Sequence, residues 1–367
     1  MENADCTVEG LGLRMNHIIK EDIEGIIHNP LPWEKLAGKR ILITGANGYL
    51  ATYMVYTLLG LNDAFHLNLK VVALCRNKER AFSKFGEFKN RDDLITVIQD
   101  VVDNIDDQYR ADYIIHAASP ANAYAYEINP YGVFSANVLG YHNLLKKYEQ
   151  WQVKKVLAFS SYVIYGDHMP EEGTLESYRG TFDFTDYRHV YALSKQMTEM
   201  MSSIYIEKMK ANISIVRPAI IYGPGMGYSQ KKHITDFVKN YLFDDSIQLK
   251  STGEVVRSFL YIKDAVLAFF TVLLTDNECT AYNVCSENSV CSIRELAETF
   301  ASLDKKLKVV VNIPPEEEKN TYLKPHIKSG ILSNQKLREL GWEEETSLRD
   351  GIRKTVEWAK NVDFINM

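Results

Sequence analysis

A glycine turn between an apolar strand and a helix is the feature that most restricts the fold of this chain. The run Ile41–Thr44 leads into G-x-x-G-x-x-A at residues 45–51, and a helical pattern begins within this motif. Because the first glycine permits a tight turn and the second lets phosphates approach the backbone, such a turn is typical of dinucleotide sites. The N-terminus of the helix faces the same phosphates. The residues predicted to bind the dinucleotide here are Gly45, Asn47, Gly48, Tyr49 and Leu50.

Short apolar runs alternate with helical patterns through the first 220 residues. The alternation predicts an α/β fold with a doubly wound parallel sheet. The further buried strands are predicted at residues 70–75, 94–100, 111–118, 153–161 and 213–218. The longer helices are predicted at residues 49–59, ending at Gly60, and at 132–151 and 190–208.

The chain of 367 residues is long enough for more than one domain. Residues 1–35 form an N-terminal extension, in which a short amphipathic helix at 18–28 ends before two prolines. We predict that this extension braces the sheet or contributes an oligomer contact. Residues 36–220 form the dinucleotide-binding domain. Residues 221–367 mainly form a smaller substrate domain with a hairpin around 246–261, and some of its segments return to the sheet.

Composition excludes several classes of partner. The net charge is −6 and the 42 Lys and Arg residues form no basic block, which argues against nucleic acid. No apolar run reaches about 18 residues, so we expect no transmembrane helix and no membrane partner. The five cysteines include no C-x-x-C pair, which predicts reduced thiols in a cytoplasmic protein. No histidine pair has metal-ligand spacing, and we predict no metal site.

The ends of the predicted strands indicate the kind of dinucleotide. The second strand ends at Arg76 rather than at an acidic residue, which favours the 2′-phosphate of NADP over NAD. Asp100, followed by Val101, lies after the third strand and is predicted to accept a hydrogen bond from the adenine amine. Small residues that permit close approach of the cofactor end the fourth strand: Ala117, Ala118 and Ser119.

A Y-x-x-x-K pair supplies the candidate catalytic groups. Tyr191 and Lys195 are four residues apart in a predicted helix, so their side chains share one face. A lysine ammonium there favours the phenolate, and we predict that it lowers the pKa of Tyr191 toward neutrality. Ser161 ends a parallel strand, where substrates bind in such folds, and is predicted to hydrogen-bond the reacting oxygen. The three residues indicate proton transfer coupled to hydride transfer.

With these residues, the chain resembles the extended short-chain dehydrogenase/reductases, the nucleotide-sugar epimerase/dehydratase family, over about residues 38–358. The resemblance also rests on HAASPA (116–121), YGPG (222–225) and RSFLYIKDA (257–265). It implies a Rossmann domain, Tyr191 as the base, Lys195 as its partner and ribose ligand, and Arg257 as the ligand of the substrate diphosphate. The other residues implied are Asn137 and Pro218 at the cofactor and Pro120, Tyr162 and Ile220 at the substrate.

The reaction stays open between members of this family. The pattern is most similar to UDP-glucuronate decarboxylases and UDP-sugar 4-epimerases, but Val163 stands where decarboxylases and dehydratases carry a glutamate. Ile220 also replaces the usual asparagine. We therefore favour a C4 epimerase; the alternatives are a decarboxylase, an NADPH-dependent 4-keto-sugar reductase and, more remotely, a non-catalytic dinucleotide-binding scaffold. The resemblance implies NAD, where Arg76 favours NADP, and a homodimer built on the helices at 132–151 and 190–208.

Overall fold

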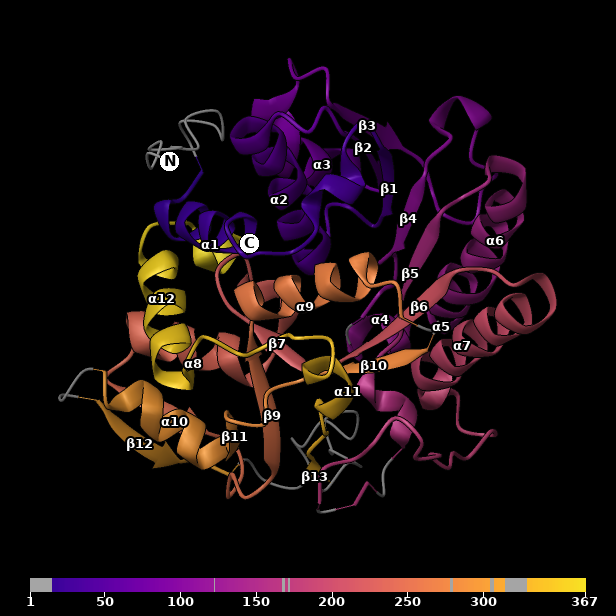
Figure 1. Ribbon diagram of the computed structural model, residues 1–367. Coiled ribbons are helices and arrows are strands. Elements are labelled where there is room, and N and C mark those ends of the chain that lie inside the picture. Colours follow the sequence, from indigo (N-terminus) through magenta and orange to yellow (C-terminus); the bar gives the residue numbers. More distant parts are fainter. Residues whose placement is uncertain are drawn as a thin grey trace.

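A seven-stranded parallel sheet forms the centre of the protein (Figure 1). The structure is a computed structural model that describes residues 15–121, 123–166, 169–170, 172–277, 280–303, 307–313 and 329–367. The strand order is β10-β6-β5-β4-β1-β2-β3, so the chain reverses direction across the sheet between β1 and β4. The strands are β1 Arg40–Thr44, β2 Lys70–Cys75, β3 Leu94–Ile98, β4 Tyr113–His116, β5 Lys155–Phe159, β6 Ile213–Pro218 and β10 Ala281–Val284. The predicted doubly wound α/β fold is confirmed.

Both faces of this sheet are buried, because successive side chains of a strand point to opposite faces. Ile41 and Ile43 of β1 belong to one apolar core and Leu42 to the other. Helices α2 and α9 cover the first face, and α6 and α7 cover the second (Figure 1). The helices are α1 His17–Ile27, α2 Tyr49–Phe65, α3 Lys78–Phe85, α4 Ala123–Ile128, α5 Pro130–Phe134, α6 Gly140–Trp151, α7 Val190–Met209, α8 His233–Phe243, α9 Ile262–Leu274, α10 Ile293–Ala301, α11 Gln335–Arg338 and α12 Leu348–Lys360.

The remaining strands form two smaller sheets. The strands are β7 Ile220–Tyr222, β8 Ser246–Leu249, β9 Val256–Tyr261, β11 Val290–Ser292, β12 Lys308–Val311 and β13 Ser329–Gly330. β9 pairs with β7, β11 and β13, whereas β8 pairs with β12. The predicted hairpin at 246–261 is therefore wrong. The loop between β8 and β9 instead binds the start of α10, since the carbonyls of Gly253 and Val255 accept hydrogen bonds from Arg294 and Ile293.

Two helix predictions also need correction. Helix α2 continues through Gly60 to Phe65, and Gly60 is buried inside it. The helix predicted at 132–151 is interrupted by a π-helical turn at Ser135–Leu139. Tertiary burial stabilises the longer helix beyond the glycine, while the π-turn turns Asn137 into the interior. β10 joins the central sheet from beyond residue 220, and the proposed domain limits stay a prediction.

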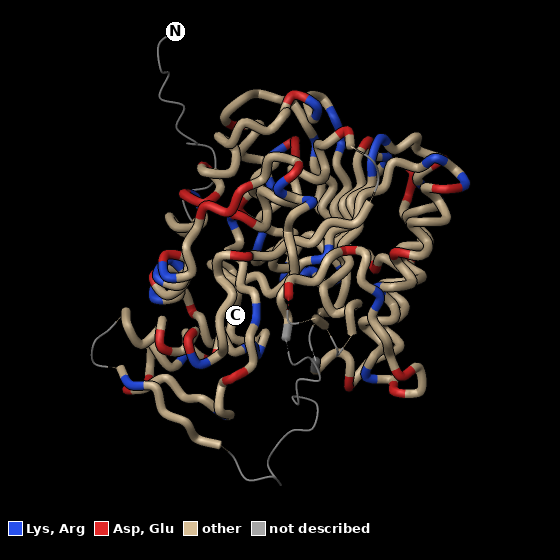
Figure 2. The backbone as a smooth tube through the Cα atoms, turned by 60° about the horizontal axis from the view of Figure 1, so that its bottom comes forward, with Lys and Arg blue, Asp and Glu red and all other residues tan. Residues whose placement is uncertain are grey.

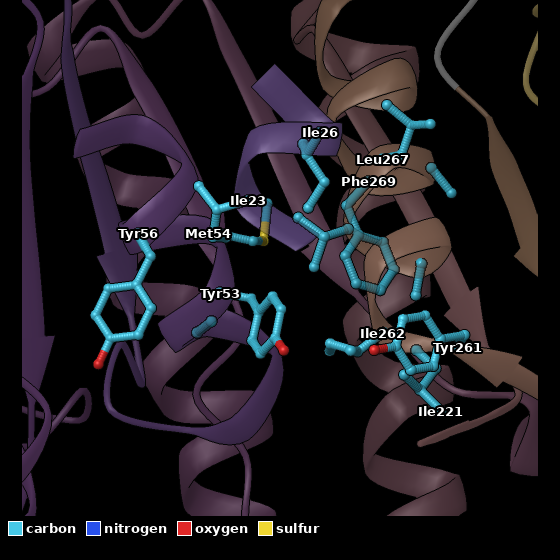
Figure 3. Close-up of a cluster of buried hydrophobic side chains, with 14 of the residues drawn as sticks. Ile23, Ile26, Tyr53, Met54, Tyr56, Ile221, Tyr261, Ile262, Leu267 and Phe269 are labelled. Carbon is cyan, nitrogen blue, oxygen red and sulfur yellow. The ribbon is translucent and has the colours of Figure 1, made fainter. Parts of the chain in front are cut away.

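The described part of the N-terminal extension packs into the main core. Figure 3 shows Ile23 and Ile26 of α1 in one cluster with Met54 of α2 and Phe269 of α9. At the edge of this cluster the fully buried Asp22 carboxylate accepts hydrogen bonds from the hydroxyls of Tyr261, at 2.8 Å, and Tyr53, at 3.3 Å. Lys354 of α12 donates a third at 3.3 Å. Asp22 therefore connects α1 with α2, β9 and α12, as expected of a brace.

Removing this carboxylate is expected to destabilise the protein. In Asp22→Ala the two buried tyrosine hydroxyls lose their acceptor, and we expect a loss of about 2–4 kcal/mol in the free energy of unfolding. Chemical denaturation of the two proteins measures the difference. The matched control is Glu21→Ala, which removes a 61% exposed carboxylate from the same lysine and should cost at most about 1 kcal/mol. Equal losses for both variants would show that Asp22 is not the brace.

A buried ion pair fixes the position of α7 against the sheet. The Arg217 guanidinium of β6 donates to both oxygens of Glu199 on α7, at 2.9 and 2.6 Å, and to the Tyr165 hydroxyl at 2.8 Å. Such a two-pronged pair holds its partners in one orientation. Elsewhere Figure 2 shows Lys and Arg interspersed with Asp and Glu over the outer elements, while the strands in the middle carry few of either.

Candidate functional site

The glycine turn after β1 has the geometry that a bound phosphate requires. Gly45 has φ of +64°, and a Cβ at this position would lie 2.7 Å from the Cα atom of Ala118. Only glycine fits without displacing the end of β4. Gly48 is the N-cap of α2, and the amides of the first helical turn lack intrahelical partners. Asn47 donates from its side chain to the carbonyl of Asn77 at 3.2 Å, which fixes the turn against the end of β2.

The other two residues predicted at this turn place their side chains in the core. Tyr49 and Leu50 pack against the apolar cluster between α2, α1 and α9. Their contribution to a phosphate site is therefore limited to backbone amides at the start of α2.

The ends of β2 and β3 bring Arg76 and Asp100 together. The Arg76 guanidinium lies 3.8 Å from the Asp100 carboxylate, and the arginine side chain is 65% exposed. Asp100 also accepts the amide of Val102 at 3.1 Å, while Val101 is buried against Gly140 of α6. An arginine that is already paired offers less positive charge to an additional phosphate, which weakens the argument for NADP.

The end of β4 lies beside the glycine turn, since parallel strands place their carboxyl ends at one edge of the sheet. Ala117, Ala118, Ser119 and Pro120 are all half-buried here. Thr44 connects the two strand ends: its hydroxyl bonds His116 Nδ1 at 3.0 Å and accepts the amide of Ala118 at 3.3 Å. Sequence reasoning missed Thr44, because nothing in its local pattern separates it from an ordinary strand residue.

Three polar atoms at this edge have no hydrogen-bond partner within the described part of the chain. They are Ser119 Oγ, Asn137 Oδ1 and Ser160 Oγ, and all three atoms are buried. Asn137 is held by its other side-chain atom, since Nδ2 donates to Ser194 of α7 at 2.8 Å. Buried polar atoms without partners indicate a missing ligand or water. Together with the cradle at Gly45, they fit a dinucleotide laid along the carboxyl edge of the sheet.

The structure brings Ser161, Tyr191 and Lys195 together. Ser161 follows β5, and its side chain forms a hydrogen bond with that of Tyr191 at the start of α7. One turn further, the Lys195 ammonium lies 5.9 Å from the centre of the Tyr191 ring. It donates to the carbonyl of Phe159 at 2.6 Å, which ties α7 to the end of β5. The geometry of proton transfer at Tyr191 is therefore in place.

The electrostatics of this cluster differ from the sequence prediction. Burial raises the pKa of Tyr191 to about 12, although its hydrogen bond with Ser161 acts in the opposite direction. Burial also lowers the pKa of Lys195 to about 7. The predicted lowering of the tyrosine pKa is thus not a property of the polypeptide alone, because desolvation disfavours both charged forms. Both groups are held near-neutral and dry, ready to respond to charge brought by a ligand.

The substrate residues lie beside this cluster. Tyr162 follows Ser161, and its phenol is close enough to Tyr191 and to Arg257 to affect the pKa of each. Arg257 of β9 is 7% exposed and donates to the carbonyl of Val256 at 2.8 Å. Burial lowers the pKa of its guanidinium. Pro218 ends β6, and Ile220, which begins β7, is half-buried.

A second tyrosine contacts Tyr191 that sequence reasoning did not single out. The Tyr126 ring of α4 stacks on the Tyr191 ring, with 4.9 Å between centroids and 14° between planes. The only available signal was the tyrosine-rich composition of residues 124–131, which sets no spacing to Tyr191.

Residues 41–285 match the NAD dependent epimerase/dehydratase family. Over 337 residues the chain is 24% identical to dTDP-D-glucose 4,6-dehydratase of Bos taurus, covering 88% of this chain and 89% of that protein. Over 317 residues it is 27% identical to UDP-glucuronic acid decarboxylase 6 of Arabidopsis thaliana, covering 85% and 86%.

Solved structures show the same fold. UDP-glucose 4-epimerase of Thermotoga maritima superposes with a TM-score of 0.75 at 21% identity, covering 88% of this chain and 99% of that chain. UDP-glucuronic acid 4-epimerase of Bacillus cereus, solved with UDP-glucuronic acid and NAD, superposes with a TM-score of 0.74 at 18% identity, covering 88% and 99%. Among the described helices, none is long and apolar enough to cross a membrane. The match over two thirds of its length places this chain in the NAD-dependent epimerase/dehydratase family, whose members use a nicotinamide dinucleotide.

Proposed function

We propose that this protein is a C4 epimerase of a nucleotide-diphosphate sugar that acts through a transient 4-keto sugar. The observation that carries the proposal is the contact of Tyr191 with Ser161 and its proximity to Lys195, with Val163 where an additional acid would be needed for elimination. Epimerisation needs one group that moves a proton at the C4 oxygen and a cofactor that accepts and returns hydride.

The residues of the site divide this work between them. The bound nicotinamide supplies the acceptor for hydride. Ser161 hydrogen-bonds the C4 oxygen, and Tyr191 takes its proton when the carbon is oxidised and returns it when the carbon is reduced. Lys195, next to Tyr191, stabilises the phenolate in its charged form. Because the lysine pKa is about 7, its charge is available at neutral pH only in part of the molecules, and added charge at the site changes this fraction.

Arg257 is the candidate ligand of the substrate diphosphate. Its guanidinium is almost completely buried, and a planar fork of donors matches the geometry of phosphate oxygens. The sugar then spans the distance between Arg257 and Tyr191, where Tyr162 interacts electrostatically with both. A diphosphate anchor that leaves the sugar ring unattached suits an epimerase, because the keto sugar must present both faces to the hydride donor.

The same residues argue against the related reactions. Elimination across C5–C6 needs a proton acceptor near C5, and a valine at 163 supplies none. Decarboxylation depends mainly on the 4-keto group and is less affected by Val163, so it is the nearer alternative. A reductase that consumes NADPH is favoured only by Arg76, whose pairing with Asp100 reduces its charge.

The proposal is tested by the fate of the cofactor and of the C4 hydrogen. The purified protein is denatured and the released small molecules are identified by mass spectrometry. The same preparation is then given UDP-hexoses and UDP-hexuronates deuterated at C4. Stoichiometric NAD, together with a C4-inverted product that keeps its deuterium, is the expected result. Release of CO₂ would instead identify a decarboxylase, and net oxidation of added NADPH would identify a reductase.

Replacing Arg76 tests the choice between the two dinucleotides. If Arg76 binds the 2′-phosphate, Arg76→Ala should weaken NADP by about tenfold and leave NAD unchanged, since one charge-assisted hydrogen bond is lost. Calorimetric titration of protein freed of retained dinucleotide measures both affinities. Lys89→Ala, which removes another exposed cation of this region, is the control. Equal changes for NAD and NADP would mean that Arg76 does not recognise the 2′-phosphate.

We also propose a homodimer built on α7. Three apolar side chains of this helix are strongly exposed at a spacing that puts them on one side: Met197, Met200 and Ile204, at 46%, 58% and 51%. We call them the α7 stripe. Charging it in Met200→Asp/Ile204→Asp should halve the mass measured by light scattering at micromolar concentration. Phe82→Asp, at a 70% exposed apolar residue of α3, should leave the mass unchanged. A wild-type monomer would contradict the proposal.

We place the enzyme in the cytoplasm. Cys75 and Cys285 are buried free thiols, and burial raises the pKa of Cys75 to about 11. Such thiols suit a reducing compartment. Fractionation of cells that express the tagged full chain tests this assignment.

A further inference from the structure

The Tyr126 ring covers one face of the proposed catalytic tyrosine. The two rings are nearly parallel, at 14°, and their centroids are 4.9 Å apart. The Tyr126 phenol is itself shielded from water, and burial raises its pKa well above the ordinary value. A ring held this closely leaves Tyr191 with one open face and fixes the plane of its phenol.

The position of Tyr126 is set by its attachment to the same helix that carries Tyr191. Helix α4 leads directly into α5, where the Asn129 side chain caps the helix by accepting the amide of Gly132 at 2.9 Å. Helix α5 in turn packs on α7, as Figure 1 shows for these elements. At the other end, α4 is joined to β4 through Ser119 and Pro120 beside the proposed cofactor site. Tyr126 is therefore held between the cofactor edge and α7.

We propose that Tyr126 is a positioning residue, whose ring orients Tyr191 and keeps water from its buried face, so that the sugar hydroxyl meets the phenol from the open face only. The inference rests on the proposed function and goes beyond it, because it assigns a role to a residue outside the Ser161, Tyr191 and Lys195 set. The ring does this work; the hydroxyl of Tyr126 is not required, since stacking involves the ring faces.

The proposal predicts a distinct response to loss of the ring. The titratable groups that face Tyr191 are Tyr126 from α4, Tyr162 from the turn after β5 and Lys195 from α7 itself. Of these, only Lys195 carries charge near neutral pH. Replacing the aromatic ring by a smaller aliphatic side chain admits water to the Tyr191 phenol, and hydration favours the charged form. The pKa of Tyr191 should then fall, while its orientation becomes less uniform.

The test compares Tyr126→Leu with Tyr126→Phe in the full chain. We expect Tyr126→Leu to lower kcat by about tenfold or more while KM changes by less than about threefold, as for a misplaced catalytic group. The pKa of Tyr191, followed by NMR of ¹³C-labelled tyrosine and assigned by the signal lost in Tyr191→Phe, should fall by about one unit. Tyr126→Phe keeps the ring and should retain wild-type kcat and the wild-type Tyr191 pKa. Tyr124→Leu, at a 63% exposed tyrosine of the same helix, is the control for α4.

Several results would overturn the proposal. An unchanged Tyr191 pKa in Tyr126→Leu would show that the ring does not shield the phenol. A higher KM with normal kcat would make Tyr126 a substrate contact instead, and an equal loss in Tyr126→Phe would assign the role to the hydroxyl. The NMR titration needs no substrate, so it tests the positioning role even when the wild-type protein fails to epimerise any nucleotide sugar. Failure of the proposed function is thus separated from failure of this inference.

Discussion

Tyr191→Phe is expected to lower kcat for the nucleotide sugar by about 10²–10⁴-fold, the range typical of a lost proton-transfer group. The ring and its stacking on Tyr126 stay in place, because only the hydroxyl is removed. Ser161 alone cannot replace the missing proton carrier, since a serine hydroxyl has no accessible charged form near neutral pH. Initial rates at saturating substrate, over a range of pH, measure the effect.

The control for this variant lies on the same helix. Tyr205 is about four turns along α7, and burial raises its pKa as well. Tyr205→Phe should keep wild-type rates. Tyr191→Phe should also retain the dinucleotide, because the glycine turn and the ends of β2, β3 and β4 are unchanged. Undiminished turnover in Tyr191→Phe would remove Tyr191 from the mechanism, and the proposed reaction with it.

The second large effect is expected at Arg257. Its replacement by leucine removes two charge-assisted hydrogen bonds to the diphosphate, each contributing about 1.5–3 kcal/mol, which predicts a rise in KM of about 10²-fold or more. The effect on kcat should be smaller, because the diphosphate contact persists in both ground state and transition state. Competition by free UDP and other nucleoside diphosphates, measured by calorimetry, reports the same contact without turnover.

Arg257→Lys keeps the charge but not the planar fork, so we expect an intermediate affinity. It also guards against failure to fold, since it leaves no buried cavity lined by unpaired partners. Arg353→Leu, at an exposed arginine of α12 paired with Asp350 at 2.8 Å, is the matched control. If both Arg257 variants bound nucleoside diphosphates as the wild type does, the substrate would have to be anchored by other residues.

Together the two variants separate chemistry from binding. Tyr191→Phe should lower kcat and preserve diphosphate affinity, whereas Arg257→Leu should do the reverse. The distinction follows from their locations, since Tyr191 is on α7 next to β5 and Arg257 is on β9 of a different sheet. A variant that lowered both quantities equally would indicate damage to the fold instead.

Local patterns were sufficient for the central parts of the fold and of the site. The strand and glycine turn at 41–51 are defined by neighbouring residues, and the structure gives Gly45 the positive φ that its role requires. The Y-x-x-x-K spacing places Tyr191 and Lys195 on one face of a helix, wherever that helix packs. Parallel strands put their carboxyl ends at one edge, so the predicted strand ends already implied that Ser161 and Ala117 lie near the same ligand.

Contacts distant in sequence could not be predicted in this way. Helix α2 passes through Gly60 because the surrounding core stabilises it, and β9 pairs with β7, β11 and β13 because these segments meet only in the folded chain. The same holds for the π-turn that points Asn137 inward. Local propensity differs by less than about 1 kcal/mol per residue, and tertiary packing outweighs it.

The electrostatics show the division most clearly. By itself the sequence determined which residues carry the chemistry, Ser161, Tyr191 and Lys195, because their order and spacing follow from strand and helix geometry. Only the tertiary structure decided that these groups are desolvated, that Tyr126 covers Tyr191 and that Asp22 connects α1 to two tyrosines and a lysine. Burial depends on every element packed around a group, and no local pattern specifies all of them.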